Sequence, residues 1–244
     1  MNEVLPPDIR KTEEKGIDEY LSEGFNLIIT NPKILIPFTV PLVVSIFYGV
    51  YLLENLFRGR IFAFSMISEI SQLTWRQFLM ISAFAVTVIV VFMLWGIEVI
   101  AYFVVKKRDV SDAMRYGIKR LPITFVNYTV LLAIIFAFFA PIVVVRSLWF
   151  VLLYSFLVAI LVSPLVFLLS PVIVEKTFGI VDAFVLYKRT FKKSLILGLL
   201  YSLVSSAVSS LIPVIGGALN TIIVVPGFIA VYSLLYTDYK KIRN

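Results

Sequence analysis

The sequence predicts an all-α integral membrane protein. Six transmembrane helices are expected, as three hairpins of the same orientation, each preceded by a cytoplasmic amphipathic helix. Three observations lead to this prediction: an apolar composition, six long uncharged runs and a repeated helical pattern. Hydrophobic residues make up 60% of the 244 residues and charged residues 15%, whereas soluble domains are about 45–50% apolar and about 25% charged. The composition excludes an ordinary soluble enzyme domain and a disordered tail.

Six uncharged or nearly uncharged runs are each close to or longer than the roughly 20 residues that an α-helix needs to cross the hydrocarbon. They occupy residues 34–53, 78–105, 121–145, 147–174, 194–215 and 218–236. A proline and a glycine pair within 213–218 predict a tight turn between the last two runs. We therefore expect a cytoplasmic N-terminal segment at 1–33, a membrane domain at 34–236 and a cytoplasmic tail at 237–244.

The distribution of basic residues predicts the orientation of the spans. Eighteen of the 22 Lys and Arg residues lie before the first, third and fifth spans or after the last one. Under the positive-inside rule this side faces the cytoplasm, so both termini of this multi-pass cell-membrane protein are expected there. The same rule accounts for the net charge of +7 without nucleic acid as a partner. On the other side, apolar residues at helical spacing in 54–77 predict a helix on the outer surface.

A repeated pattern precedes the first, third and fifth spans. Positions 0, 3, 4, 7, 8 and 11 counted from Ile17, Val110 and Ile180 are mostly apolar, with Lys188 the only clear break. This is the spacing of one face of an amphipathic helix. An acidic residue lies two positions after each start, in the first turn, where the helix dipole favours negative charge; these residues are Glu19, Asp112 and Asp182.

The pattern has two explanations: an internal repeat of common origin, or three interfacial helices that each lead into a span. Each helix would be followed by an outward and a returning span, so the units would be related by an axis along the membrane normal. The helices either brace the next span in the headgroup layer or bind anionic lipid or a soluble partner. The candidate headgroup contacts are Lys106, Lys107, Arg108, Lys119, Arg120, Lys188, Arg189, Lys192 and Lys193.

Two short motifs carry a family resemblance. One is Pro171-Val172-Ile173-Val174-Glu175, followed by Gly179 and Asp182-Ala183, and the other is Gly24 with Asn31-Pro32 ahead of the first span. With these motifs the chain resembles six-helix, archaeal-type prokaryotic integral membrane proteins of unknown function. Those proteins are related to the membrane domain attached to some glycerophosphodiester phosphodiesterases. The resemblance implies the six-span fold, and it transfers no active-site residue.

Few polar side chains lie within the spans. Glu98 is the only ionisable residue there, toward the cytoplasmic end of its span. Such residues are functional candidates by default. Glu98 is expected either to anchor the helix, paired with Lys106 or Arg108 or hydrated, or to couple a proton or ion. Asn127 and Asn220 are expected to form hydrogen bonds between helices.

The residue types that are absent limit the chemistry. Cysteine and histidine do not occur, which excludes disulfides, thiolate metal ligands, a cysteine nucleophile and a histidine base. We expect no cofactor, no metal and no enzymatic activity. The expected function is a scaffold or accessory protein in envelope or lipid homeostasis, with the lipid bilayer and a membrane or cytoplasmic protein as partners. The alternatives are a small permease or lipid transporter with Glu98 as its coupling residue, and a lipid enzyme using Glu175 and Asp182.

Overall fold

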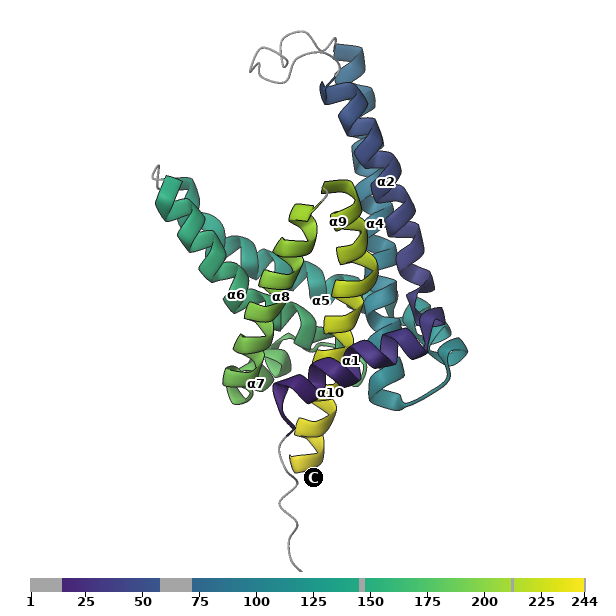
Figure 1. Cartoon of the computed structure of the whole chain (residues 1–244), viewed down its shortest axis with the longest axis vertical. Helices are drawn as coiled ribbons and strands as arrows, with labels where there is room; N and C mark the ends of the chain where they lie inside the picture. The colour runs from purple at the N-terminus through teal and green to yellow at the C-terminus, as the bar shows by residue number, and fades with distance from the viewer. Residues whose placement is uncertain (1–14, 58–71, 145–147, 212, 244) are drawn as a thin grey trace, which may run out of the picture.

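The computed structural model describes residues 15–57, 72–144, 148–211 and 213–243, and nearly all of these residues are helical. No strand occurs within these ranges. Figure 1 shows the elements, which in chain order are α1 (Ile17–Thr30), the 3-10 helix η1 (Pro32–Leu35), α2 (Ile36–Phe57), α4 (Gln72–Lys106), α5 (Val110–Val144), α6 (Leu148–Ile173), α7 (Ile180–Arg189), α8 (Phe191–Leu211), α9 (Pro213–Leu219), the π-helix η2 (Asn220–Val224) and α10 (Val225–Arg243).

Five stretches of helix within the described residues are long and apolar enough to cross a membrane. They are Arg76–Lys106, Val110–Phe139, Leu153–Ile173, Phe191–Ser210 and Gly216–Lys241. A sixth qualifies only if α1 is joined to Pro32–Tyr48, and these two pieces meet at an angle of 89°. The chain is therefore a multi-pass helical membrane protein with five or six candidate spans.

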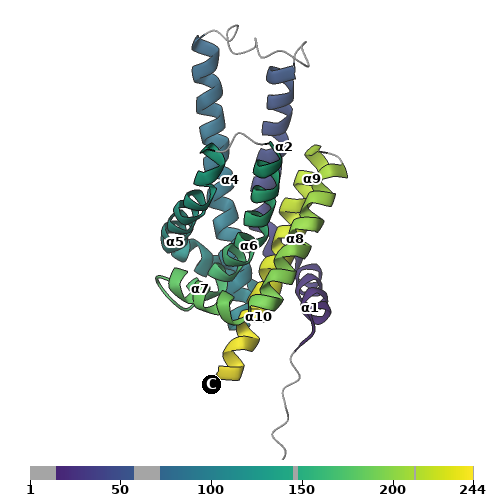
Figure 2. The same cartoon turned by 90° about the vertical axis from the view of Figure 1, so that its left-hand side faces the viewer.

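Helices that follow one another in sequence pack against one another, and α4 contacts α5 at least as extensively as it contacts α2. α2 contacts α4, α5 contacts α6, and α8 contacts α9, while α10 lies against α1, α4 and α6. The last turns of α4 and α10, the first turns of α5, and the helices α1 and α7 gather at one end of the molecule, which we call the basal end (Figures 1 and 2). From there the α2–α4 pair and the α5–α6 pair diverge (Figure 1).

Helix α5 differs from the sequence-based expectation because it runs without a break from Val110 to Val144. The sequence predicts an amphipathic helix that starts at Val110 and a separate span at 121–145, and the structure has no such boundary. The pair Asn31-Pro32 ends α1, but no such pair lies between the expected amphipathic helix and the expected span in α5. Pro122 removes only one backbone hydrogen bond, and the helix continues through it.

The tight turn expected at 213–218 is also absent, because Pro213–Leu219 form helix α9. Helices α8 and α9, on either side of residue 212, pack against each other instead. Proline suits the first position of a helix, where its missing N–H has no partner in any case. Gly216 is needed for close packing, since an added Cβ atom would collide with the carbonyl oxygen of Val208 on α8.

The outer helix expected within 54–77 falls mainly on residues outside the described ranges. Its first and last residues belong to neighbouring helices, because α2 continues to Phe57 and α4 begins at Gln72. Both helices are therefore longer than the apolar runs at 34–53 and 78–105. Apolar composition marks the part of a helix that lies in hydrocarbon, and a helix with enough internal hydrogen bonds continues past that limit.

Helix α1 is held across α10 by close contacts at two glycines. A Cβ atom added to Gly24 would lie 2.5 Å from Cγ2 of Val231 and 3.0 Å from the backbone nitrogen of Val231. On α10, Gly227 leaves room for the ring of Phe25, which packs edge-to-face on Phe228 with 5.9 Å between centroids. Small residues at a crossing let two helix backbones approach closely, which is how membrane helices gain packing contacts.

Ion pairs also connect the two ends of the described chain. Nζ of Lys15, just before α1, lies 2.6 Å from Oε2 of Glu23 and 3.5 Å from Oδ2 of Asp238 on α10. Asp238 in turn accepts a hydrogen bond from Lys241, at 2.9 Å. The start of α1 and the end of α10 are therefore adjacent at the basal end.

Replacing Gly24 by alanine should weaken the docking of α1 on α10. The added methyl group has no free space there, and overpacking of this kind costs about 1–3 kcal/mol. Gly217→Ala is a matched control, because nothing lies within 4 Å of the added Cβ atom and alanine favours a helix by up to about 1 kcal/mol. The measurement is the free energy of unfolding in mixed micelles, followed by circular dichroism. Equal effects of the two substitutions would contradict this account of the crossing.

Candidate functional site

Polar side chains of three helices, α4, α5 and α10, meet at the basal end around residues 174–179, which connect α6 to α7. We call this connection the 174–179 loop. Two groups of residues are described in turn. The Glu175 cluster comprises Glu175, Lys106, Tyr236 and Lys240, and the Glu98 cluster comprises Glu98, Tyr116, Arg120, Thr124 and Tyr128.

The Glu175 cluster joins the ends of three helices. Lys106, the last residue of α4, donates to Oε1 of Glu175 at 2.9 Å. From α10, Lys240 donates to both carboxylate oxygens at 2.8 Å, and the hydroxyl of Tyr236 donates to Oε2 at 2.6 Å. Only 16% of the Glu175 side chain is exposed. The carboxylate is therefore largely enclosed, and charge-assisted hydrogen bonds of this kind are stronger than neutral ones.

The electrostatics of this cluster keep Glu175 ionised. Burial raises the pKa of the carboxyl group, but the hydrogen bonds from Lys240, Tyr236 and Lys106 outweigh burial and hold the pKa at about 2. The nearby Asp182 has a partner of its own, since Lys176 lies 2.6 Å from its Oδ1. The two carboxylates considered above as an enzymatic pair are thus each bound to lysine.

Asn127 ties α5 to the 174–179 loop. Its Nδ2 donates to the carbonyl oxygens of Ile123 and Thr177, each at 2.9 Å, and its Oδ1 accepts from the backbone N–H of Gly179 at 2.9 Å. The side chain is buried. A buried amide whose donor and acceptor both have partners stabilises one arrangement of the loop. Asn127 thus bonds to a loop as well as to its own helix.

Two tyrosines of α5 extend this network and were missed at the level of sequence. Tyr116 donates to the carbonyl oxygen of Val174 at 2.7 Å and accepts from Nε of Arg120 at 2.9 Å, while Tyr128 donates to the carbonyl oxygen of Val166 at 2.9 Å. Spacing was the signal that could have found them. Residues 116, 120, 124 and 128 are polar and four positions apart, so they form one stripe along the helix, with Asn127 beside it.

Glu98 does not have the partners that the sequence suggested. Lys106 binds Glu175 instead, and Arg108 is exposed beyond the end of α4. The Glu98 side chain is fully buried, and neither carboxylate oxygen has a hydrogen-bond partner among the described residues. The polar groups that act on it are the Thr124 hydroxyl and the Arg120 guanidinium. The pairing with Lys106 or Arg108 was therefore wrong, because both residues lie past the buried part of the helix.

Asn220 begins the π-helical turn η2. Its side-chain oxygen is buried and has no hydrogen-bond partner among the described residues. We expected Asn220 to form a hydrogen bond between helices, and its side-chain oxygen forms none with the described residues. A π-helical turn displaces the backbone ladder by one residue and often occurs at functional positions.

The candidate headgroup contacts fall into two groups. Three of them are used within the protein: Lys106 binds Glu175, Arg120 binds Tyr116, and Lys193 donates to the carbonyl oxygen of Lys15 at 3.2 Å. The other side chains are exposed at the basal end, although Arg189 also donates to the hydroxyl of Tyr239; these residues are Lys107, Arg108, Lys119, Lys188, Arg189 and Lys192.

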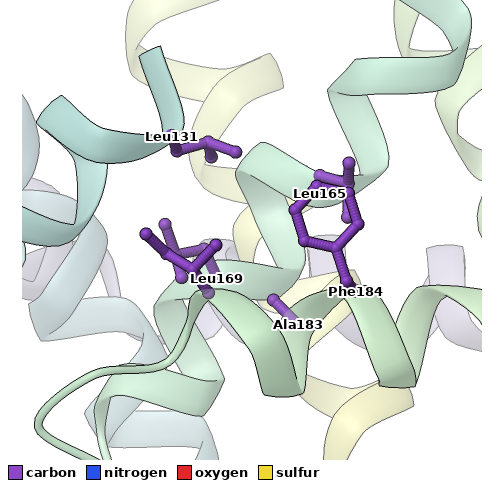
Figure 3. Close-up of a pocket in the computed structure, with 6 residues that line it drawn as sticks. Leu131, Leu165, Leu169, Ala183 and Phe184 are labelled. Carbon is purple, nitrogen blue, oxygen red and sulfur yellow. The ribbon is translucent and has the colours of Figure 1, made fainter. Parts of the chain in front are cut away.

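An apolar recess lies between α5, α6 and α7 (Figure 3). It is lined by Leu131, Leu165, Leu169, Ile180, Ala183 and Phe184, and it leaves no room for a water molecule. Ligand sites are usually larger and contain several convergent polar groups. Within the described ranges, no three Asp or Glu side chains are grouped so that they could hold a metal ion. The polar clusters are therefore the candidate site.

Replacing Glu175 by glutamine should change how stability depends on pH. Because the pKa of Glu175 is about 2 in the folded protein and ordinarily 4.5, its contribution is present above pH 4.5 and is lost as the pH falls toward 2. Wild type should lose about 1–2 kcal/mol over this range, a value reduced by solvent screening. Glu175→Gln should be less stable at pH 7 and less sensitive to acid. Unfolding midpoints at pH 7 and pH 3 test this, with the exposed Glu19→Gln as control, and parallel pH dependence of wild type and Glu175→Gln would contradict it.

The comparisons with known proteins add no family to this description. A scan of family models, a search of curated proteins and a search of solved structures found no match to the chain. Composition and helix length show a multi-pass helical membrane protein. The resemblance to six-helix prokaryotic membrane proteins remains a prediction from short motifs, and the polar clusters must be interpreted from their own geometry.

Proposed function

We propose that this chain is a non-enzymatic scaffold or accessory protein of the cell membrane, acting in envelope or lipid homeostasis through its basal end. One observation carries the proposal: the basal surface presents exposed apolar and basic side chains side by side on α7. The polar groups beneath that surface bind one another and the loop backbone. These internal hydrogen bonds hold the basal end in one arrangement, and its outer surface remains available to lipid or protein.

The outward face of α7 has the chemistry of a membrane interface. Phe178, Val181 and Val185 are exposed, Val181 by 66%, while Ile180, Ala183 and Leu186 on the opposite face are buried. Lys188 continues the outward stripe, and Lys192 follows at the start of α8. An apolar stripe that ends in basic residues suits acyl chains and anionic headgroups. Anionic lipid at the cytoplasmic face is therefore the proposed ligand.

We also propose the topology that this surface requires. The consecutive pairs α2–α4, α5–α6 and α8 with α9–α10 would be three hairpins of the same orientation, introduced by α1, the first turns of α5, and α7. Apart from Arg76, the described Lys and Arg residues lie on elements of the basal end or near it (Figures 1 and 2). By the positive-inside rule this end, with both termini, faces the cytoplasm. A common origin of the three units and membership of the six-helix family are part of the same proposal.

Purification in mild detergent should recover a stoichiometric protein partner or a defined anionic lipid. Lys188→Gln with Lys192→Gln should weaken binding of phosphatidylglycerol, added to the purified protein and followed by native mass spectrometry. Each basic residue near a membrane surface contributes about 1 kcal/mol, or roughly fivefold in affinity. Arg76→Gln, at the opposite end, is the control. Recovery of neither ligand, or equal lipid binding by wild type and the double variant, would sink the proposal.

A second candidate function is a small permease or lipid transporter with Glu98 as the coupling residue. The observation that favours it is the fully buried carboxyl group without a hydrogen-bond partner among the described residues. Ionisable groups in this position often belong to proton relays in transporters. Pro41 in α2 and Pro164 in α6 lie inside helices and favour bends there. Movement of bent helices is one route to alternating access.

Replacing Glu98 by glutamine should abolish transport if this second function is correct, because glutamine cannot take up or release a proton. The measurement is proton flux in liposomes that contain the full chain and a trapped pH-sensitive dye. Circular dichroism and size-exclusion chromatography check that the variant folds, and Glu19→Gln is the control. Flux that is unchanged in a folded Glu98→Gln variant would remove Glu98 from the mechanism.

A further inference from the structure

Glu98 lies in the most completely enclosed part of α4. Four consecutive residues, Glu98, Val99, Ile100 and Ala101, each have 0% exposure. Four successive residues point in all directions around a helix, so α4 is covered on every side at this level. Its neighbours are α2 with η1, α5, α6 and α10. The carboxyl group therefore faces protein, and neither lipid nor solvent reaches it in this conformation.

The two polar side chains that act on Glu98, Thr124 and Arg120, both come from α5. Thr124 and Arg120 act directly on the carboxyl group, and Tyr116 and Tyr128 are the titratable groups on which Glu98 acts. The other helices packed on α4 contribute no charged or titratable group to this site among the described residues. Arg120 is half-buried, and its Nε is already donated to the hydroxyl of Tyr116.

The Thr124 hydroxyl is oriented as an acceptor. It donates its hydrogen to the carbonyl oxygen of Arg120 at 3.1 Å. A hydroxyl oxygen can accept as well as donate, so its free lone pair can accept an O–H from Glu98. An ionised carboxylate would receive no hydrogen there, and an enclosed charge without donated hydrogen bonds costs several kcal/mol. A neutral carboxylic acid removes that cost and matches the acceptor.

We propose that Glu98 is a proton-binding site. In the enclosed conformation the carboxyl group is a neutral acid without a hydrogen-bond partner among the described residues, and the oxygen of Thr124 is the acceptor that α5 offers to it. When water reaches the carboxyl group, the O–H bond breaks, water takes the proton, and the carboxylate forms an ion pair with Arg120. Because Arg120 and Tyr116 lead from Glu98 toward the 174–179 loop, the proton exchanges with the basal side. A proton site at Glu98 is compatible with the scaffold function. If the chain is a transporter instead, the proton would be the coupled ion.

Labelling with dicyclohexylcarbodiimide tests the proposal directly, because this reagent adds to protonated carboxyl groups in apolar surroundings. The full chain in liposomes is treated at about pH 7.5, because an ordinary carboxyl group is ionised at that pH. Labelled peptides are then identified by mass spectrometry. Glu98 should carry about tenfold or more label than Glu175, a difference of about 1.4 kcal/mol. Glu98→Gln should lose this label, and Glu175→Gln should keep it.

Infrared spectroscopy of the wild type supplies a second measurement that does not depend on a variant. A protonated carboxyl band that shifts in deuterated water should be present at neutral pH. Thr124→Val should shift this band, because the acid loses its acceptor. Arg120→Gln should let labelling persist to higher pH, because the proton-free carboxylate loses its ion-pair partner, a change that a merely structural role would not produce.

Three results would overturn the proposal. The first is a folded wild type with neither label at Glu98 nor a protonated carboxyl band at neutral pH. The second is protection of Glu98 by Na⁺ at constant pH, which would assign the site to a metal cation. The third is a band unchanged in Thr124→Val together with labelling unchanged in Arg120→Gln. None of these results bears on lipid binding at α7, so failure here is distinguishable from failure of the scaffold function.

Discussion

A carboxylate that accepts hydrogen bonds from two other helices determines how the basal end is assembled. Glu175 directly follows α6, and its donors come from the ends of α4 and α10. Asn127 connects α5 to the same loop. The 174–179 loop, which follows α6, is therefore where α4, α5 and α10 meet. If one pair moved away, a largely enclosed charge or a buried backbone group would lose its partner, which is costly.

This constraint also explains where the molecule is tight and where it diverges. The hydrogen bonds between distant segments are concentrated at the basal end, whereas the far halves of the α2–α4 and α5–α6 pairs expose large apolar side chains such as Phe47, Phe84 and Phe136. In a bilayer those faces contact lipid tails, which are as apolar as the side chains. The hydrophobic effect therefore does not drive the helices together there. Packing between the pairs therefore combines apolar contacts of α4 with α5, and of α10 with α4 and α6, with the polar contacts at the basal end. The glycine crossing of α1 on α10 adds to it.

The membrane helices could be predicted from the sequence because a run of about 20 apolar residues has few other stable structures. Their ends could not, since hydropathy reports the hydrocarbon region and α2 and α4 continue past it. At 213–218, the glycines that suggested a turn instead allow α9 to pack on α8. Glu98 and Asn127 were identified because polar residues stand out in apolar runs, but their surroundings were not. Two of the three partners of Asn127 are backbone atoms 50 and 52 residues away, and Lys106 meets Glu175 across 69 residues of sequence. No local pattern records such contacts.

The ion pair between Lys15 and Asp238 brings the first and last parts of the described chain close together. When the two ends of a fold lie together at its surface, a short linker can join them, and new ends can be opened elsewhere. In this protein the natural place to cut lies between α5 and α6, because the end of α5 and the start of α6 are far from the basal contacts (Figure 1). A circular permutant opened there would keep every contact of Glu175, Asn127 and Gly24 while changing the order in which the helices enter the membrane. The contacts that hold the helices together therefore do not depend on the order in which the helices follow one another along the chain.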